Sequence, residues 1–284
     1  MAEIKVEGLS HVYSAGTPFE KVAIDDINVT IAPGELVGII GHTGSGKSTF
    51  IQHLNALLRP TSGSVYCGGK DINADKLSRR DVKSQVGLVF QYPEYQLFEE
   101  TVYKDIAFGP KNMKLPEAEI DQRVREAAAF VGVEEELFDQ SPLELSGGQK
   151  RRVAIAGVIA MRPGVLILDE PTAGLDPEGC ARILENILSY REKTGSTVII
   201  VSHNMDDVAR LCGRILVFNG GKLAMDGSPA QVFSQPEKLI GMGLNVPQAT
   251  ALAMELARQG VKLEGAIYTR QQLLDAILAG KEAR

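Results

Sequence analysis

No stretch of the sequence is long and apolar enough to cross a lipid bilayer. The longest strictly apolar run covers residues 153–161, whereas a membrane-spanning helix needs roughly 18 such residues. The first seven residues alternate charged and apolar side chains and lack the basic start and apolar core of a secretory signal. We therefore expect a chain that does not span a membrane by itself and carries no leader peptide.

Cysteine is scarce, with three residues in 284, at positions 67, 180 and 212. Their number is odd, their spacing is wide, and none belongs to a CxxC pair or has a neighbouring histidine. This pattern favours reduced cytosolic thiols over a disulfide framework. We expect Cys67, Cys180 and Cys212 to be ordinary core residues.

Positive charge is not in excess. The chain has 30 basic against 36 acidic side chains, a formal net charge of −6, which disfavours nucleic acid as the main partner. Hydrophobic residues make up 44% and charged residues 23%, as in ordinary globular proteins, which excludes a disordered, collagen-like or coiled-coil chain. We find no internal repeat, and 284 residues suffice for one or two domains.

Several short segments have the pattern of β-strands. Ile27, Val29 and Ile31 alternate with polar residues, which predicts a half-exposed antiparallel layer that also includes residues 4–6. Residues 36–40 are apolar throughout, as in a strand buried on both faces. Similar runs follow at residues 86–90, 165–168 and 198–201, separated by stretches long enough for crossover helices. This order predicts an α/β core with a parallel sheet.

The remaining segments differ from this core in the spacing of their apolar residues. Between residues 92 and 152 apolar side chains recur at helical spacing, which predicts an inserted helical subdomain. Residues 215–225 resemble a hairpin around Asn219, Gly220 and Gly221.

The tail after residue 228 carries two amphipathic helix patterns. The first has Pro247 in its first turn and Gly260 just past its end. The second begins with a capping box formed by Thr269 and Gln272. Such a tail either packs on another chain or docks on its own core, and the residues leave both possibilities open.

A phosphate-binding motif follows residues 36–40 and opens a helix pattern that contains Leu54, Leu57 and Leu58. The glycines allow backbone N–H groups to turn toward phosphates, and the helix N-terminus adds a partial positive charge. We expect Lys47 to reach the β- and γ-phosphates and Ser48 to ligate Mg²⁺. The motif consists of Gly41, His42, Thr43, Gly44, Ser45, Gly46, Lys47, Ser48 and Thr49.

Two adjacent carboxylates, Asp169 and Glu170, follow the apolar run 165–168. In an open α/β sheet the carboxyl ends of the strands are where ligands bind. Asp169 suits coordination of Mg²⁺, and Glu170 suits a general base that polarises water for attack on the γ-phosphate. Together with the phosphate-binding motif, this pair indicates an NTPase.

The kind of NTPase is indicated by Leu145 and the four residues after it. Here the chain resembles the nucleotide-binding subunits of ABC transporters, whose signature these residues match. The resemblance implies that the signature of one subunit faces the phosphate-binding loop of a second, with two ATP molecules between them. In that arrangement Ser146 and the helix N-terminus after it offer a hydroxyl and free N–H groups to a γ-phosphate. The signature residues are Ser146, Gly147, Gly148 and Gln149.

Further positions match the same family in order. Gln91 resembles the glutamine that contacts Mg²⁺ and the attacking water, and Asp176 resembles the aspartate that reaches across the dimer interface. His203 resembles the switch histidine at the γ-phosphate, and Tyr13 resembles the aromatic residue that stacks on adenine. We expect His42 only to shape the loop.

The other two histidines, His11 and His53, match no motif. We expect both to lie at the surface.

A narrower resemblance is to the ATPases of energy-coupling factor transporters, and most to the second of the two paired ATPases. It rests on residues 90–102 and 107–110, on residues 16–20, and on residues 147–161. The family has a short helix after the glutamine that grips a membrane-embedded scaffold subunit. The corresponding apolar patch, costly to expose without a partner, comprises Tyr92, Pro93, Tyr95, Leu97 and Phe98.

The resemblance covers almost the whole chain and implies its architecture. It implies an α/β fold, a P-loop NTPase ABC cassette with an antiparallel β subdomain and an inserted α-helical subdomain at about 92–152. The cassette would span residues 1–228, and residues 229–284 would form a small, mainly helical C-terminal domain that helps two ATPases to dimerise.

The resemblance also implies function and partners. ATP and Mg²⁺ would be the cofactors, and both composite sites that receive this chain's residues could hydrolyse ATP. The partners would be a second ATPase subunit, either homologous or a second copy, and the transmembrane scaffold. Through the scaffold the chain would act on a substrate-binding membrane subunit at the cytoplasmic face of a prokaryotic membrane, importing vitamins or transition-metal ions.

Two rival interpretations remain. The nearer is the ATPase of a conventional ABC importer, with the same chemistry and a different membrane partner. The more distant is an ABC ATPase that works on nucleic acid or ribosomes, but such chains carry a long coiled-coil insert, a zinc module or a second cassette, and none fits between Lys47 and Ser146.

Overall fold

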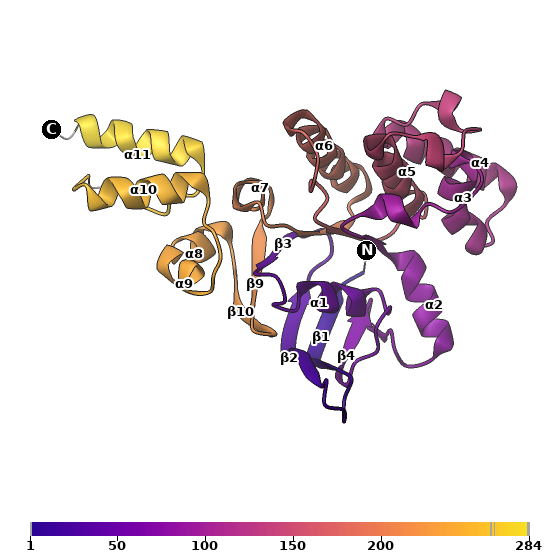
Figure 1. Ribbon diagram of the computed structural model, residues 1–284, viewed down its shortest axis with the longest axis horizontal. Helices are drawn as coiled ribbons and strands as arrows, with labels where there is room; N and C mark the ends of the chain where they lie inside the picture. Colours follow the sequence, from indigo (N-terminus) through magenta and orange to yellow (C-terminus); the bar gives the residue numbers. More distant parts are fainter. Residues whose placement is uncertain (1, 262, 264, 283–284) are drawn as a thin grey trace.

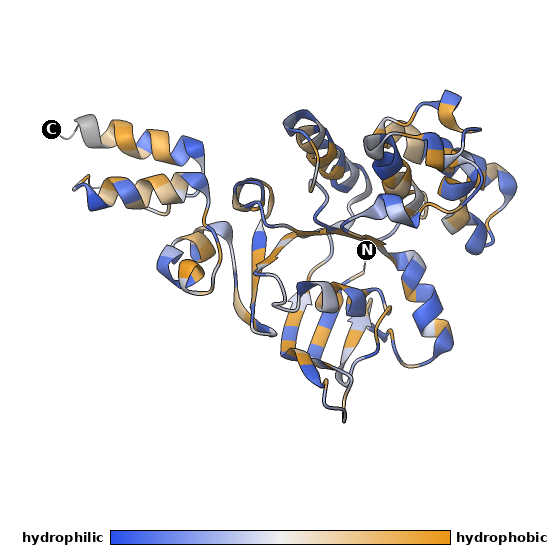
Figure 2. Cartoon of the chain, viewed as in Figure 1, coloured by the Kyte–Doolittle hydropathy of each residue, from blue (hydrophilic) through white to orange (hydrophobic). Residues whose placement is uncertain are grey.

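Two sheets form the centre of the computed structural model, which describes residues 2–261, 263 and 265–282 (Figure 1). The smaller is antiparallel, with strand order β2-β1-β4-β5. Its strands are β1 (Ile4–Tyr13), β2 (Lys21–Ile31), β4 (Ser62–Cys67) and β5 (Lys70–Asp71). Figure 2 shows hydrophobic and hydrophilic residues alternating along β1 and β2, as expected for a layer with one buried face.

The larger sheet has the order β10-β9-β3-β8-β7-β6, and its strands run parallel except for β10 at the edge. These strands are β3 (Leu36–Gly41), β6 (Val86–Val89), β7 (Val165–Asp169), β8 (Thr197–Val201), β9 (Arg214–Asn219) and β10 (Lys222–Gly227). The predicted parallel sheet and the β9–β10 hairpin are confirmed. Phe90, expected to end its strand, lies just beyond β6.

The central strands are buried on both faces because each face packs into a different core. Leu36 and Ile40 of β3 belong to the core shared with the helices. Val37 and Ile39, which point the other way, belong to the core between the two sheets. A strand between two cores needs apolar residues at every position, which explains the continuous run in the sequence.

A block of helices follows β6 and comprises η1 (Pro93–Gln96), α3 (Val102–Asn112), α4 (Glu117–Val131), η2 (Glu135–Leu137), η3 (Pro142–Glu144) and α5 (Gly147–Ile159). The predicted helical subdomain is thus present, and its last helix, α5, continues past residue 152, the approximate boundary that we expected for the subdomain. Ile155 and Ala156 of α5 pack in the same core as Ile120 and Val124 of α4.

Other helices connect the strands: α1 (Lys47–Leu54), α2 (Lys76–Gln85), α6 (Pro177–Thr194) and α7 (Met205–Leu211). Our expectation that Leu57 and Leu58 belong to the first helix is wrong, because α1 ends at Leu54 and Ala56 follows with a φ of 53°. A residue with positive φ cannot continue a right-handed helix.

The tail consists of α8 (Pro229–Phe233), α9 (Pro236–Gly241), α10 (Gln248–Arg258) and α11 (Arg270–Glu282). Phe233 and Leu239 pack in the larger core, which they share with Leu36 of β3 and Val153 of α5. In contrast, α10 and α11 share a small separate cluster that includes Ala249 and Leu273. Figure 1 shows α10 and α11 side by side, on the opposite side of the molecule from α3 and α4. The domain boundary at residue 228 remains a prediction.

Both helix patterns of the tail are confirmed, with one change at the first. Pro247 precedes α10 as its N-cap residue and does not lie in its first turn. The capping box of α11 is present, since Gln272 N–H donates to Thr269 Oγ1 over 3.3 Å and Thr269 N–H donates to Gln272 Oε1 over 3.0 Å.

The three cysteines are free thiols, as expected. Cys67 and Cys212 are buried core residues as expected, but the expectation is wrong for Cys180, which is only half-buried on α6. Among the described residues, no helix is both long and apolar enough to cross a membrane.

Candidate active site

A cleft of about 320 Å³ opens where β3, β7 and β8 reach their carboxyl ends. This edge of the sheet is where open α/β folds bind ligands. Six of the nine residues of the phosphate-binding motif line the cleft, and they are joined there by side chains from β1, β2 and three separate loops. The lining residues are Tyr13, Lys21, Ala23, Thr43, Gly44, Gly46, Lys47, Ser48, Thr49, Gln91, Asp169, Glu170 and His203.

The loop after β3 can approach its neighbours closely only because it contains glycine. Gly46 precedes α1 with a φ of 105°, and a Cβ at this position would lie 2.7 Å from the carbonyl oxygen of Ala23. No side chain caps the first turn of α1, so its N–H groups and the positive end of its dipole face the cleft. These are the requirements for binding phosphate.

Lys47 lies at the start of α1 with its ammonium group turned onto the loop. Its Nζ donates to the carbonyl oxygens of Gly41 over 2.6 Å and His42 over 3.1 Å. Burial lowers the pKa of Lys47, and the carboxylates of Glu170 and Asp169 oppose that shift. His42 in turn contacts Asn219 at the end of β9, with Nε2 3.2 Å from Asn219 Oδ1, in line with the expectation that it shapes the loop.

Ser48 and Asp169 face each other across the cleft. The Ser48 hydroxyl donates to Asp169 Oδ2 over 3.4 Å. Burial raises the pKa of Asp169, and the bond from Ser48 and the charge of Lys47 oppose this. A hydroxyl and a carboxylate are hard oxygen ligands of the kind that Mg²⁺ prefers, so the residues present fit this ion.

Glu170 is constrained in backbone and in side chain. Its φ is 51°, a conformation uncommon outside glycine, and its N–H donates to the carbonyl of Val201 over 2.9 Å. Glu170 Oε2 accepts a hydrogen bond from the backbone N–H of His203 over 3.3 Å. Glu170 Oε1 lies 3.3 Å from the ring Nε2 of His203 and has no hydrogen-bond partner in the described part of the chain. An unsatisfied buried carboxylate oxygen is costly and available to a ligand.

The environment shifts the pKa values of Glu170 and His203 so that the neutral form of each is favoured. Burial raises the pKa of Glu170, with a further rise from the charge of Asp169. Burial also lowers the pKa of His203, as does the positive charge of Lys47. With its pKa lowered, His203 is a neutral hydrogen-bonding group at neutral pH, so its contact with Glu170 is not an ion pair.

Tyr13 stands at the rim of the cleft and is 40% exposed. Its hydroxyl lies 3.3 Å from Thr49 Oγ1, and its ring packs edge to face against His11. His11 packs in the same way on His53. Our expectation that His53 lies at the surface is wrong, because His53 is fully buried on the inner side of α1, with Nδ1 2.7 Å from the carbonyl oxygen of Thr49. His11 is partly buried.

The signature residues and Asp176 do not line the cleft. Ser146 caps α5, where Gln149 N–H donates to Ser146 Oγ over 3.3 Å and Ser146 N–H donates to Gln149 Oε1 over 2.9 Å. Asp176 caps α6 by accepting the N–H of Gly179 over 2.6 Å. Ser146, Gly147 and Asp176 are exposed, and Gly148 and Gln149 are half-buried.

Arg151 was missed at the sequence level. It is 4% exposed, and its guanidinium donates to the carbonyl oxygens of Gln91, Glu170 and Ala173. One signal could have found it: Arg151 and Ile155 are four residues apart on α5, so an arginine occupies the apolar face of that helix. A charged residue on a buried face needs polar partners.

The apolar patch predicted after Gln91 is largely exposed. Tyr92 is 52%, Tyr95 84% and Phe98 65% exposed, whereas Pro93 is buried and Leu97 half-buried. Pro93 therefore adds little to the patch that we expected it to join. The predicted short helix is present as η1, and the N–H groups of Phe98 and Glu99 both donate to the carboxylate of Asp105.

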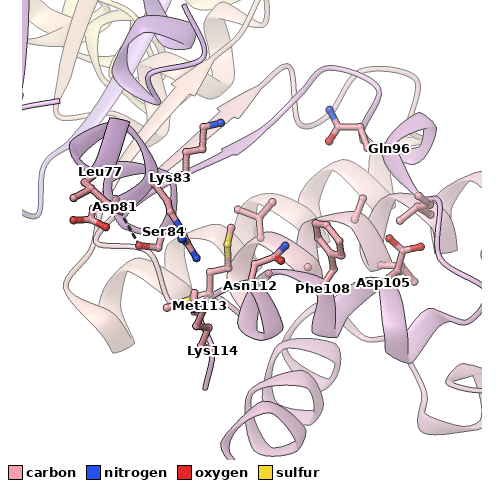
Figure 3. A pocket seen from close by; sticks show the side chains of 18 residues that line it. Leu77, Asp81, Lys83, Ser84, Gln96, Asp105, Phe108, Asn112, Met113 and Lys114 are labelled. Carbon is pink, nitrogen blue, oxygen red and sulfur yellow. Dashed lines mark hydrogen bonds between the residues drawn. The ribbon is translucent and has the colours of Figure 1, made fainter. Parts of the chain in front are cut away.

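A groove of about 670 Å³ runs beside this patch between α2, α3 and α5. Figure 3 shows Leu77 and Ser84 of α2 on one side of the groove and Phe108 and Asn112 of α3 on the other. Phe98 packs edge to face on Phe108, with ring centroids 4.8 Å apart. The patch and the groove thus form one continuous, partly apolar surface.

Comparison with known proteins agrees with this geometry. Residues 24–173, just over half of the chain, match the family model described as ABC transporter. The chain is 56% identical over 275 residues to the energy-coupling factor transporter ATP-binding protein EcfA2 of Caldanaerobacter subterraneus subsp. tengcongensis, covering 97% of this chain and 96% of the relative. It is 54% identical to EcfA2 of Clostridium perfringens, covering 97% of each.

The chain belongs to the energy-coupling factor ATPases of the ABC transporter family. Solved structures agree with this assignment. The cbiO1 protein of Clostridium perfringens, described as part of the ABC transporter complex cbiONQ, superimposes with a TM-score of 0.74 at 41% identity, over 88% of this chain and 98% of that one. The ABC cassette MJ0796, solved as a dimer bound to ADP and Pi, gives a TM-score of 0.72 at 28% identity, over 80% and 98%.

Proposed function

We propose that this chain binds Mg²⁺ and ATP and hydrolyses ATP as one ATPase subunit of an energy-coupling factor transporter. One observation carries the proposal. The cleft gathers the phosphate loop, Asp169, Glu170 and His203, while Ser146 of the same chain lies outside it. A site with phosphate-binding and hydrolytic groups but without its signature requires a second subunit.

Each side chain has a defined part in this chemistry. Adenine stacks on Tyr13 and the phosphates lie against the N–H groups that precede α1, where Lys47 exchanges its bonds to Gly41 and His42 for phosphate oxygens. Ser48, Gln91 and Asp169 would hold Mg²⁺, which neutralises phosphate charge.

Hydrolysis itself falls to Glu170 and His203. Glu170 accepts a proton from the attacking water, and its raised pKa makes it a stronger base than an ordinary carboxylate. His203 donates a hydrogen bond to the γ-phosphate while Gln91 orients the water.

A partner ATPase, homologous or identical, completes each site. Its own signature, equivalent to Ser146, Gly147, Gly148 and Gln149, covers the phosphates bound here, and this chain's signature and Asp176 serve the partner's cleft. We also propose that α10 and α11 support the dimer, because Leu252, Leu274 and Leu278 on these helices are each about half exposed.

The membrane partner binds the patch formed by Tyr92, Tyr95, Leu97 and Phe98 together with the groove beside it. We propose that this partner is a transmembrane scaffold, through which ATP-driven motion reaches a substrate-binding membrane subunit that imports vitamins or transition-metal ions. The chain would then act at the cytoplasmic face of the membrane.

The alternative, an ATPase of a conventional ABC importer, has weaker support. The chain is 56% and 54% identical to two energy-coupling factor ATPases over 97% of its length. The tail helices lie within these alignments.

Copurification tests the proposed partners. The chain is expressed together with its candidate membrane subunits and captured by an affinity tag. The wild type is compared with a double variant that carries Tyr95→Ser and Phe98→Ser. We expect a small scaffold subunit and a second ATPase with the wild type, and loss of the scaffold from the variant.

Ile240→Ser is the matched control, because Ile240 is 50% exposed but lies on α9. This variant should retain the scaffold. Recovery of two symmetric permeases with the wild type would instead favour the conventional importer.

A further inference from the structure

Arg151 joins the signature helix to the loops that carry the hydrolytic side chains. It lies in the second turn of α5, which begins directly after Ser146. Its Nη2 donates to the carbonyl oxygens of Gln91 over 3.0 Å and Glu170 over 3.1 Å, and its Nη1 donates to that of Ala173. A single guanidinium thus connects segments that are 60, 19 and 22 residues away in the sequence.

Hydrogen bonds restrain the backbone of Glu170 on both sides. Its peptide is held on the N–H side by Val201, and on the carbonyl side by both Arg151 and the N–H of Ala173. A non-glycine residue at a φ of 51° persists only where its surroundings impose that conformation. Arg151 supplies the side-chain part of that restraint.

The acceptors are neutral carbonyls, so the geometry of the guanidinium matters more than its charge. Arginine presents five donors in a planar fork, which allows one side chain to reach three carbonyls in different directions. Burial lowers the pKa of Arg151, and the negative charge of Glu94 on η1 opposes that shift. A lysine would retain the charge but could not span the same acceptors.

We propose that Arg151 is a positioning residue that holds Glu170 in place for ATP hydrolysis. The proposal rests on ATP hydrolysis as the proposed function. Arg151 does not line the cleft, and we assign its effect to the peptide of Glu170 rather than to the carbonyls of Gln91 and Ala173, which it also holds. Small displacements of a catalytic group lower the reaction rate by large factors. Loss of Arg151 therefore lowers kcat more than it weakens ATP binding.

The test compares three variants in the full chain, assembled with its partner subunits. Arg151→Met removes the donors, and Arg151→Lys retains the charge without the fork. Arg123→Met is the control, because Arg123 on α4 is also largely buried and also donates to a backbone carbonyl, that of Met161, over 3.2 Å.

We expect kcat of Arg151→Met to fall at least about tenfold, while the Kd for ATP changes less than about threefold. Arg151→Lys should recover less than half of the loss, and Arg123→Met should keep the wild-type kcat. An unchanged kcat in both Arg151 variants, or a parallel loss of ATP binding, would overturn the proposal. If Arg151→Met does not fold, Arg151→Lys carries the same readouts.

A double-mutant cycle separates this role from general stabilisation. In a Glu170→Gln background, Arg151→Met should change the residual rate less than about twofold, because the group it positions is already gone. A full tenfold fall in that background would refute positioning through Glu170. If the wild-type complex hydrolysed no ATP, the proposed function itself would fail, which is a different result from wild-type turnover in the Arg151 variants.

Discussion

Glu170 combines a left-handed backbone, a buried carboxylate and a neutral histidine neighbour. None of these properties favours stability. A residue with φ above 0° costs free energy, and a buried carboxylate with one unsatisfied oxygen costs more. Such costs at one position are typical of a residue retained for chemistry.

Glu170→Gln should bind ATP normally and lose most of its turnover. The amide keeps the size of the side chain but cannot accept a proton from water, so we expect kcat to fall by about 10²–10⁴. Equilibrium nucleotide binding and steady-state hydrolysis measure the two effects. Turnover at the wild-type rate would remove Glu170 as the base.

The same variant has a predicted effect on thermal stability. Because the pKa of Glu170 is raised in the folded state, its charge destabilises the fold above that pKa, and the penalty disappears as the pH falls and the carboxyl is protonated. Glu170→Gln should therefore have a higher Tm than the wild type at neutral pH, with a difference that vanishes toward a pH of about 4.

The control is Glu185→Gln, since Glu185 is exposed in the middle of α6. Its Tm should follow the wild type at every pH. A Glu170→Gln protein less stable than the wild type at neutral pH would contradict the predicted cost of the buried charge.

Tyr13→Ala should weaken ATP binding without slowing the hydrolysis of ATP that is already bound. Stacking of a base on an aromatic ring is worth about 1–3 kcal/mol, so we expect the KM for ATP to rise roughly 5- to 150-fold while kcat stays near the wild-type value. Phe19→Ala serves as control, because Phe19 is 83% exposed and absent from the cleft lining. A KM equal to that of the wild type would exclude Tyr13 as the adenine platform.

At the scale of elements, α5 and α8 begin with the same capping box, a serine paired with a glutamine three residues later. Ser146 with Gln149 caps α5, and Ser228 with Gln231 caps α8, each through reciprocal hydrogen bonds. Their local stabilisation is therefore comparable. They differ in that only α5 carries the family signature, which makes α8 a natural reference for it.

Ser146→Ala and Ser228→Ala should each lower stability by about 1 kcal/mol, the usual value of such a cap. Only Ser146→Ala should also reduce ATP turnover, because its hydroxyl is proposed to bind the γ-phosphate in the partner's cleft. Thermal unfolding and hydrolysis assays on both variants test this. Equal turnover in the two variants would show that Ser146 is only a helix cap.

At the scale of the whole molecule, the fold separates groups that are proposed to act together. The phosphate loop and Glu170 line the cleft of one chain, and the signature of that chain lies outside it. The patch around Tyr95 and the paired helices α10 and α11 likewise leave apolar side chains exposed. Exposed apolar surface of this kind is typical of a subunit rather than an isolated enzyme.

Hydrolysis per chain should fall on dilution of the isolated protein. A monomer lacks the partner's signature, so its rate should drop as the concentration passes below the dimer dissociation constant. Hydrolysis measured over a dilution series, beside sedimentation of the same samples, tests this. A constant rate per chain well below the dissociation constant would contradict a composite site.

Much of the fold follows from local pattern. The apolar run at 36–40 predicts a strand buried on both faces, and the structure gives that strand a core on each side. The hairpin at β9–β10 and the capping box at Thr269 depend on contacts between close neighbours in sequence. The sequence pattern therefore predicts both. β4, β5 and α2 had no such signal. Ser62–Cys67, for example, contains glycine and serine and forms a strand by pairing with β1 and β5.

The errors at His53 and Pro93 share a physical cause. His53 looks like a polar surface residue, but α1 turns its ring inward, where the Thr49 carbonyl and His11 receive it. Pro93 was placed in an exposed patch, but η1 turns it into the protein. Whether a residue in a short helix faces in or out depends on what packs beside it, which lies far away in the sequence.

The motifs, their order and the family can be identified from the residues alone, because glycine, lysine and carboxylate chemistry at fixed spacing is a local property. Which of these groups meet depends on the folded arrangement. It brought Tyr13, Gln91 and His203 to one cleft, kept Ser146 outside it, and placed Arg151 against three loops. Contacts between residues distant in sequence arise from packing of the sheets and helices, and no local pattern encodes them.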